Sequence, residues 1–247
     1  MCLVSVVIPA YKATDFIRTA VDSIHGTIDY EIIVVIDDDG TVDEYQKAAG
    51  GVRKVNFYKN SKNMGVTYSR NKGYFRSKGE IVVFLDADDE LTVKIDCLWS
   101  EIKANYAGIY FFRCIDDDGA IVGTASAGEG RGVNTITEMI NMNNHGERLV
   151  AVRKNAGSYP PFIALTRGHE MAGLLRFSKL HSCPNVFYSS LTARQYRMIN
   201  QKSLSRMRKN NSRFISIGHY LVFIFLFKRC NFASMTWLLK SVVRRLL

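Results

Sequence analysis

The 247-residue chain is predicted to have an α/β fold, with a doubly wound, mostly parallel sheet flanked by helices and a basic C-terminal tail. Short runs rich in Val and Ile alternate with segments whose apolar residues recur at helical spacing, which is typical of parallel strands covered on both faces. A hydrophobic content of 47% is sufficient for one full core without disulfides. The five cysteines include no CxxC pair, so neither a zinc site nor a secreted disulfide framework is indicated.

The first unit is predicted to be a strand followed by a helix. Residues 3–8 (LVSVVI) form a short β-branched run closed by Pro9, as expected of a buried strand. Thr14 offers an N-cap, and apolar residues then recur at helical spacing until Gly26.

Three further strands and a second helix are predicted before residue 100. Residues 31–36 and 81–85 are buried strands by the same criteria, and 52–58 is a weaker one. A helix is expected over 66–77. The alternation of strands and helices indicates parallel pairing.

Two acidic clusters follow buried strands directly. One is residues 37–39, and the other is residues 86–90, which hold four acids in five positions. Because ligands of open α/β sheets bind at the carboxyl ends of the strands, both clusters are expected in one crevice. Clustered carboxylates repel each other unless a cation or a donor-rich ligand binds between them. We therefore expect Mg²⁺ or Mn²⁺ to bind there together with phosphate groups. For either cluster alone, a solvated turn is the alternative.

Residues 3–100 resemble the nucleotide-sugar-binding half of a family 2 glycosyltransferase with the GT-A fold. The matching stretches are VSVVIPAY (4–11), EIIVVIDDDGTVD (31–43) and NMGVTYSRNKGYFRSKGEIVVFLDADDEL (63–91). The family usually reads EIIVVDDGSTD, whereas this chain has an extra Ile36. We align Asp38, Asp39 and Gly40 with the Asp-Asp-Gly of the family.

The resemblance implies a nucleotide-sugar donor, with a UDP-sugar expected, and roles for the residues around its nucleoside. Pro9, Ala10 and Tyr11 would lie along the nucleoside, with Tyr11 stacked on the base. Asp39 would accept hydrogen bonds from the base edge, and Asp38 would shape that loop. A carboxylate that accepts from a base N–H makes a charge-assisted contact that discriminates between bases.

The resemblance also implies a diphosphate site. Arg70, in a triplet that resembles the family's Ala-Arg-Asn, would approach the nucleotide or its diphosphate, and a solvated helix residue is the alternative. The stretch Asp86-Ala87-Asp88 resembles the family's DXD element, with Asp86 near the ribose and Asp88 on the metal that bridges the phosphates. Asp89 is expected behind these two, without touching the metal.

Family 2 enzymes invert the anomeric centre by direct displacement, so the resemblance implies one general base for the acceptor hydroxyl. In relatives this base is a carboxylate downstream of the DXD element, often in a Glu-Asp pair before a helix. We expect Glu170, which opens an apolar helical pattern, to be this base, with a helix-capping or buried-pair role as the alternative. His169 stands in the preceding place and is the second candidate. The other acids downstream of Asp118 are Glu129, Glu138 and Glu147.

The chain is predicted to divide into a transferase domain and a tail. The domain spans 1–200, with a donor-binding half over 1–105 and an acceptor-binding half over 106–200, and the tail spans 201–247. Within the second half, the run DDDG at 116–119 is interpreted as a hairpin turn between strands over 108–115 and 120–125.

The tail is strongly basic. After Glu170 there is no Asp or Glu, although the whole chain carries a net charge of only +10. Basic residues flank the apolar run 214–227, which is shorter than the roughly 20 residues of a transmembrane helix, and 232–247 is a second basic amphipathic segment. This pattern favours peripheral attachment to an anionic membrane surface, with core packing or nucleic-acid binding as alternatives.

The favoured function is an inverting, metal-assisted transfer of a sugar to a lipid-linked or surface-glycan acceptor. The absence of a signal peptide favours a cytoplasmic location, peripheral on the cytoplasmic face of the membrane. One alternative is a catalytically degenerate, nucleotide-binding scaffold at the membrane. Another is a nucleotidyltransferase, although the stretch after the first strand lacks the Gly-rich loop with Lys or Arg that this class favours. No nucleic-acid module accompanies the basic charge, so nucleic acid is not expected as a partner.

Overall fold

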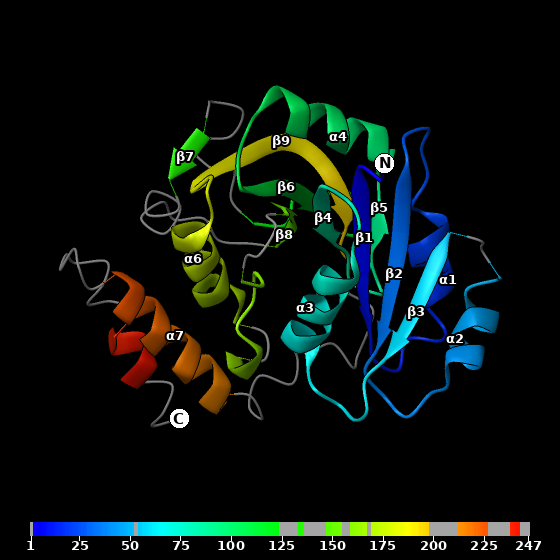
Figure 1. Cartoon of the computed structure of the whole chain (residues 1–247), viewed down its shortest axis with the longest axis horizontal. Coiled ribbons are helices and arrows are strands. Elements are labelled where there is room, and N and C mark those ends of the chain that lie inside the picture. The colour runs from blue at the N-terminus through cyan, green and yellow to red at the C-terminus, as the bar shows by residue number, and fades with distance from the viewer. Residues whose placement is uncertain are drawn as a thin grey trace.

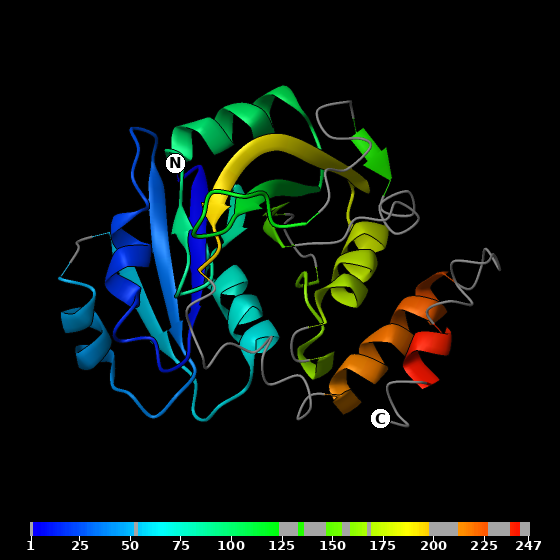
Figure 2. The ribbon, with the colours of Figure 1, turned by 180° about the vertical axis from the view of Figure 1, so that it is seen from behind.

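A computed structural model of the chain describes residues 2–51, 54–123, 133–135, 147–154, 159–166, 169–197, 212–226 and 238–242. Its centre is a nine-stranded sheet in the order β3-β2-β1-β4-β8-β6-β9-β5, with β7 paired to β9. The C-terminal helix α7 and the helical residues 238–242 lie beside α6, at the end of the molecule opposite β3 and α2 (Figures 1 and 2).

The first half of the sheet is parallel. Its strands are β1 (Val4–Ala10), β2 (Tyr30–Ile36), β3 (Val55–Lys59) and β4 (Ile81–Phe84). The helices between them are α1 (Ile17–Asp22), α2 (Val42–Ala48) and α3 (Val66–Arg76). Because β1 lies between β2 and β4 and runs parallel to both, the carboxyl ends of these three strands share one edge.

The second half of the sheet is mixed. Its strands are β5 (Glu90–Leu91), β6 (Ile109–Ile115), β7 (Val133–Thr135), β8 (Arg148–Arg153) and β9 (Asn185–Gln195). β8 runs antiparallel between β4 and β6, β9 runs parallel to β6, and β5 and β7 are antiparallel to β9. The helices of this half are α4 (Ile95–Ala104), the 3-10 helix η1 (Ala164–Thr166) and α6 (Glu170–Leu180).

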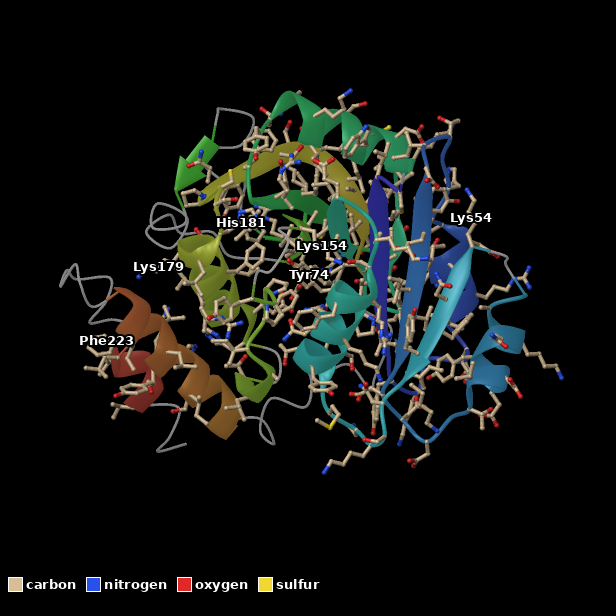
Figure 3. The ribbon with its side chains drawn as sticks, in the orientation of Figure 1. Lys54, Tyr74, Lys154, Lys179, His181 and Phe223 are labelled. Atoms are coloured by element: carbon tan, nitrogen blue, oxygen red, sulfur yellow. The ribbon has the colours of Figure 1, made fainter. Side chains whose placement is uncertain are left out.

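Side-chain alternation along β1 divides the core into two layers. Val6 and Ile8 belong to the layer that includes α1 and α4, whereas Val7 faces the layer of α3 and α6. In this second layer Tyr74 of α3 packs edge-on against Phe177 of α6, with ring centroids 6.3 Å apart. Figure 3 draws the side chains on the ribbon, with Tyr74 labelled. The packing of α3 against α6 brings the starts of both helices toward the same end of the sheet.

The α/β fold class is confirmed, and so is the predicted turn at 116–119. One Asp116 carboxylate oxygen accepts the backbone N–H groups of Asp118 at 3.1 Å and Ala120 at 2.9 Å. Gly119 has a φ of 79°, a left-handed conformation that glycine adopts without strain. The strand predicted over 120–125 was wrong for 120–123, where the structure has only an isolated antiparallel bridge between Ile115 and Ile121, and residues 124–125 lie outside the described residues.

The predicted start and end of the first helix were wrong. The N-cap is Phe16, not Thr14, and the helix ends at Asp22, before Gly26. The Ala13 carbonyl accepts from the backbone N–H groups of Phe16 at 3.0 Å and Ile17 at 2.8 Å, so the chain completes a turn before the helix begins.

The tail forms a helix that packs onto the domain. α7 (Ser212–Leu226) lies against α6 and η1, with Gly218 and Val222 buried. The Ser216 hydroxyl donates to the Ser241 carbonyl at 2.9 Å, which ties helical residues 238–242 to α7. Among the residues that the structure describes, no helix has the length and apolar character needed to cross a membrane.

Candidate active site

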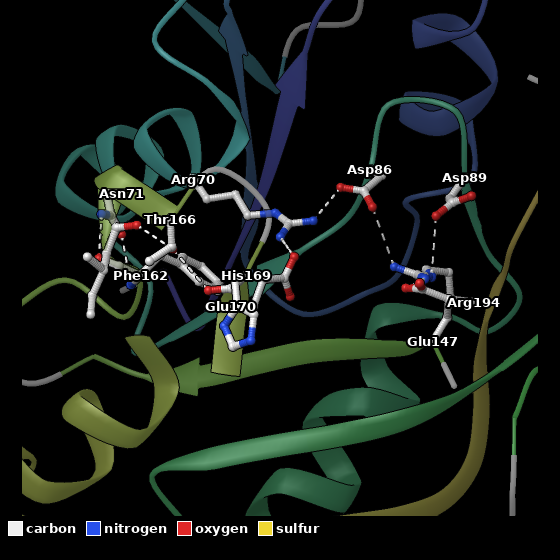
Figure 4. Close-up of polar contacts among 11 residues, drawn as sticks. Arg70, Asn71, Asp86, Asp89, Glu147, Phe162, Thr166, His169, Glu170 and Arg194 are labelled. Carbon is white, nitrogen blue, oxygen red and sulfur yellow. Dashed lines mark hydrogen bonds and ion pairs between the residues drawn. The ribbon is translucent and has the colours of Figure 1, made fainter. Parts of the chain in front are cut away.

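The candidate site lies at the carboxyl edge of the parallel strands. Pro9 and Ala10 end β1, while the acidic clusters 37–39 and 86–90 follow β2 and β4. The pairing of β1 with both neighbours therefore brings the predicted nucleoside and diphosphate residues to one edge of the sheet. Figure 4 shows the part of this site that follows β4.

Asp37 holds together the loop after β2. Its carboxylate accepts from the Asn60 side-chain amide at 2.7 Å and from the backbone N–H groups of Met64 and Gly65, each at 2.8 Å. Gly65 has a φ of 91° and begins α3 as its N-cap. Asp37 is buried, so its carboxylate is used within the chain and not presented to a ligand.

Asp38 shapes the predicted nucleoside loop. Its carboxylate accepts from the Gly40 N–H at 2.8 Å, from the Tyr45 hydroxyl at 2.7 Å and from the Lys12 N–H. Asp39 is exposed and borders an open hollow of about 760 Å³. This position agrees with the expected recognition of a base edge, which stays a prediction.

Tyr11, the predicted stacking residue, is exposed at the end of β1. Its side chain is 46% exposed, and the Lys12 ammonium lies 5.5 Å from its ring centroid. Lys12 has a φ of 51°, so the backbone turns sharply just after Tyr11. An exposed ring on a fixed turn is suited to stacking with a planar base.

Arg70 joins the predicted donor site to the predicted base. Its guanidinium donates to Asp86 at 2.6 Å and also to Glu170, although its own side chain is only 7% exposed. Burial alone would lower the pKa of Arg70, but the charges of Asp86 and Glu170 raise it above its usual value, so the residue stays cationic. The alternative of a solvated helix residue is wrong.

Arg194 was not identified from the sequence. Its side chain is 3% exposed and makes ion pairs with Asp86 at 3.7 Å, Asp89 at 3.3 Å and Glu147 at 3.2 Å. Burial would lower its pKa, but the surrounding acidic groups raise it above the usual value. Its only sequence signal is that it is the single charged residue of β9. Arg70 and Arg194 together hold the Asp86 carboxylate from both sides, as Figure 4 shows.

The network carries more acids than bases. Asp89 is 1% exposed, and burial raises its pKa to about 8; Arg194 opposes this shift, while the charges of Asp86 and Asp88 add to it. Burial also raises the pKa of Glu147, again against the effect of Arg194. Asp89 is therefore largely protonated at neutral pH, but the carboxylates of Asp86, Asp88 and Glu170 still outnumber Arg70 and Arg194, which favours an additional cation.

The residues after β4 fit a divalent metal that a substrate completes. Ala87 is buried, whereas Asp86 and Asp88 on either side of it are half-buried. Mg²⁺ is commonly bound by one or two carboxylates together with substrate phosphates and water, so a complete cage of protein ligands is not required. Within the described ranges, no three His, Cys, Asp or Glu side chains form a group that could hold a metal. Asp88 would hold such an ion, because both oxygens of Asp86 already face arginines.

Glu170 is the first residue of α6, and its side chain is one-third exposed. It pairs with Arg70 beside a cavity of about 20 Å³, which has room for one water molecule. Glu147 lines the same cavity, whereas Glu129 and Glu138 lie outside the described residues. The pair with the buried Arg70 fits the alternative of a buried-pair role, while the one-third exposure leaves the Glu170 carboxylate accessible, so its role as the base stays a prediction.

His169, the second candidate base, is half-buried against α7. Its ring lies edge-on to His219 of α7, with centroids 4.8 Å apart and planes at 85°. Burial, helped by His219, lowers the pKa of His169 to about 4. The residue is therefore neutral at physiological pH, and its half-buried ring faces His219.

Sequence comparison gives relatives among bacterial glycosyltransferases. Amylovoran biosynthesis glycosyltransferase AmsB of Erwinia amylovora is 37% identical over 93 residues, which are 35% of this chain and 31% of that protein. The GalNAc(5)-diNAcBac-PP-undecaprenol beta-1,3-glucosyltransferase of Campylobacter jejuni is 22% identical over 226 residues, or 87% of this chain and 71% of that protein. The aligned segments span 31–41% of the length of three further curated relatives.

Solved structures of similar fold include TarS from S. aureus. Its residues 1–349 superpose with a TM-score of 0.67 at 14% identity, covering 98% of this chain and 71% of that chain. The complex of the same protein with UDP-GlcNAc gives a TM-score of 0.64 at 14% identity, covering 97% of this chain and 79% of that chain. This similarity concerns the fold. The sequence model of a protein family described as glycosyl transferase family 2 matches residues 5–166, which is more than half of the sequence. The chain therefore belongs to glycosyl transferase family 2.

Proposed function

We propose that the protein transfers a sugar from a UDP-sugar to a hydroxyl group of a lipid-linked or surface-glycan acceptor, with inversion at the anomeric carbon. The observation that carries this proposal is the position of Arg70, which binds both Asp86 of the donor site and Glu170, the candidate base. A single buried cation thereby links the leaving-group side to the proton-accepting side of one site.

The reaction is a direct displacement. The acceptor oxygen forms a bond to the anomeric carbon while the bond from that carbon to the diphosphate oxygen breaks, and UDP leaves. Glu170 takes the hydroxyl proton, as a general base opposite the leaving group. When bound at Asp88, Mg²⁺ or Mn²⁺ would offset the negative charge that develops on the diphosphate. Arg70 and Arg194 keep Asp86 ionised, since they lower its pKa more than burial raises it.

Three observations support a uridine nucleotide and a glycan acceptor. The exposed Tyr11 and Asp39 offer a stacking face and a carboxylate at the expected nucleoside position. The structural neighbour TarS was solved with UDP and with UDP-GlcNAc. The name of the Campylobacter jejuni relative describes an undecaprenol-linked acceptor, which motivates the lipid-linked class here.

The same proposal includes peripheral attachment to the cytoplasmic face of an anionic membrane. On α7, the exposed residues Ile217, Tyr220 and Ile224 follow a spacing of three and four, so they share one face of the helix. Leu239 and Val242 of the last helical stretch are also exposed. The chain after Glu170 has basic but no acidic residues, which favours anionic lipid.

A nucleotide screen tests the proposed function. Melting temperatures are measured with UDP, GDP and ADP, with and without Mn²⁺, and UDP release is then followed with a panel of UDP-sugars. We expect stabilisation by UDP that requires Mn²⁺, and UDP release with at least one donor. Metal-dependent UDP binding without any turnover would favour the alternative of a degenerate scaffold, and no UDP binding would contradict both.

A further inference from the structure

The tail helix α7 contacts the residue next to the candidate base. α7 packs on α6 and η1, and its His219 ring meets the ring of His169 edge-on at 4.8 Å. His169 is the N-cap of α6, and Glu170 follows it as the first residue of the helix. The position of the Glu170 backbone therefore depends on how His169 is held.

The contact between α7 and His169 is unusually close because residue 218 is glycine. A Cβ atom at Gly218 would lie 2.3 Å from Cγ and 2.6 Å from Cβ of His169, a separation that real side chains do not adopt. Gly218 is buried within a helix that is apolar for much of its length. Glycine lowers the stability of a helix relative to alanine, and this close approach is the structural reason for its presence here.

The other side of His169 is fixed by η1. The His169 N–H donates to the Thr166 carbonyl at 3.1 Å, and the Thr166 hydroxyl is shared between the carbonyls of Ile163 at 2.7 Å and His169 at 3.0 Å. Thr166 is fully buried. His169 is thus clamped between η1 and α7, and Glu170 extends from this clamp to Arg70.

We propose that α7 is part of the active site, in which Gly218 and His219 are positioning residues that hold His169 and thereby place the Glu170 carboxylate against Arg70. This inference rests on the proposed function, because it takes Glu170 to be the base. It assigns the tail a second role beyond membrane attachment. Misplacing a reacting group by about 1 Å reduces rates on the order of 10²-fold, so a small shift of α7 is sufficient to affect turnover.

The test compares His219→Ala, His219→Phe and Gly218→Val in the full chain. For each variant, UDP release from the UDP-sugar panel gives kcat, calorimetry gives the UDP affinity, and unfolding gives Tm. We expect His219→Ala and Gly218→Val to lower kcat about 10- to 100-fold with UDP affinity within about twofold of the parent. His219→Phe keeps a ring at the contact and should restore most of the lost kcat.

His181 supplies a matched control at the other end of α6. It is buried, it is the C-cap of the helix, and its ring lies 4.9 Å from that of Phe177. His181→Ala should lower Tm while kcat of the folded enzyme stays within about twofold of the parent. If His219→Ala and Gly218→Val behave like His181→Ala, or if they lose kcat, UDP affinity and Tm together, α7 is only structural and the proposal is overturned.

A second readout separates failure of this inference from failure of the proposed function. Histidine ring resonances are recorded by NMR in the parent and in Glu170→Gln, without any donor or turnover. We expect Glu170→Gln to shift the signals of His169 and His219 but not that of His181. An unchanged His219 signal would overturn the coupling even in an active enzyme. If the His219 signal shifts in Glu170→Gln but the parent releases no UDP, the coupling is retained and the proposed reaction is rejected.

Discussion

Replacing Arg194 by methionine should lower the free energy of unfolding by about 3–5 kcal/mol at neutral pH. Methionine matches the aliphatic stem of arginine and lacks the charge, so the variant removes this cation from Asp89 and Glu147 and leaves Asp86 with Arg70 alone. At an effective dielectric constant of about 20, each unit charge at the observed separations attracts Arg194 by about 4–5 kcal/mol. The release of the buried guanidinium to water on unfolding offsets much of this sum. Asp86 contributes most to the net loss at neutral pH, because Asp89, with a pKa of about 8, is then largely protonated and Glu147 is half exposed.

The free energy of unfolding that Arg194→Met loses relative to the parent should grow with pH. Arg70 and Arg194 lower the pKa of Asp86 despite its burial, so the stability that this pairing gives is present above the unfolded pKa and is lost on acidification. The pKa of Asp89 is raised to about 8. The contribution of Asp89 to the free energy of unfolding is therefore full below about pH 4 and is lost as pH rises through 8. Without Arg194 this pKa rises further, and the penalty extends above pH 8. Because of both effects, the Arg194→Met variant should be least stable, relative to the parent, in alkaline solution.

Urea unfolding followed by circular dichroism at pH 4, 7 and 8.5 measures this difference. The matched control is Arg197→Met, because Arg197 also pairs with an acid, Glu90, but its side chain is 38% exposed. An exposed pair contributes at most about 1 kcal/mol, so this variant should remain close to the parent. A loss below about 1 kcal/mol for Arg194→Met at pH 7, or a loss that shrinks as pH rises, would refute the assigned role of Arg194.

Three further predictions concern the metal, the membrane and the core. Asp88→Ala should abolish the Mn²⁺ dependence of UDP binding without changing the fold, and calorimetry that finds undiminished affinity would remove Asp88 as a metal ligand. The double substitution of Ile217 and Ile224 by serine should release the full chain from anionic vesicles at physiological salt; continued co-sedimentation would place the attachment elsewhere. Gly73→Ala should destabilise the protein by about 1–3 kcal/mol, because its Cβ would lie 2.2 Å from Val7. An unchanged Tm would contradict this last prediction.

The parallel half of the fold follows from local sequence pattern. The runs at 31–36 and 81–85 are continuous and β-branched, and the strands observed there begin and end within one residue of the predicted ranges. The mixed half of the sheet was harder to predict from the sequence. β9 contains two serines, a threonine and a buried arginine, so neither strict alternation nor a continuous apolar run identifies it.

The candidate site shows the same division between local and long-range information. Motif resemblance assigned roles to Arg70, Asp86 and Glu170 separately. It did not predict that the guanidinium lies between the two carboxylates, because that contact depends on α3 and α6 packing on one face of the sheet. Arg194 was missed for a related reason. Its burial is tolerable only where carboxylates from other parts of the chain surround it, and no local pattern records those neighbours.

The most direct test of the account is the turnover of Glu170→Gln. The amide keeps the shape of the side chain and an oxygen that can accept from Arg70, but it cannot take a proton from an acceptor hydroxyl. We predict that UDP affinity stays within about twofold of the parent while UDP release in the presence of acceptor falls about 10²- to 10⁴-fold. Glu147→Gln, which changes a residue lining the same cavity as Glu170, should lower the rate of UDP release much less. Turnover near that of the parent in Glu170→Gln, or a larger loss in Glu147→Gln, would contradict the assignment of Glu170 as the base.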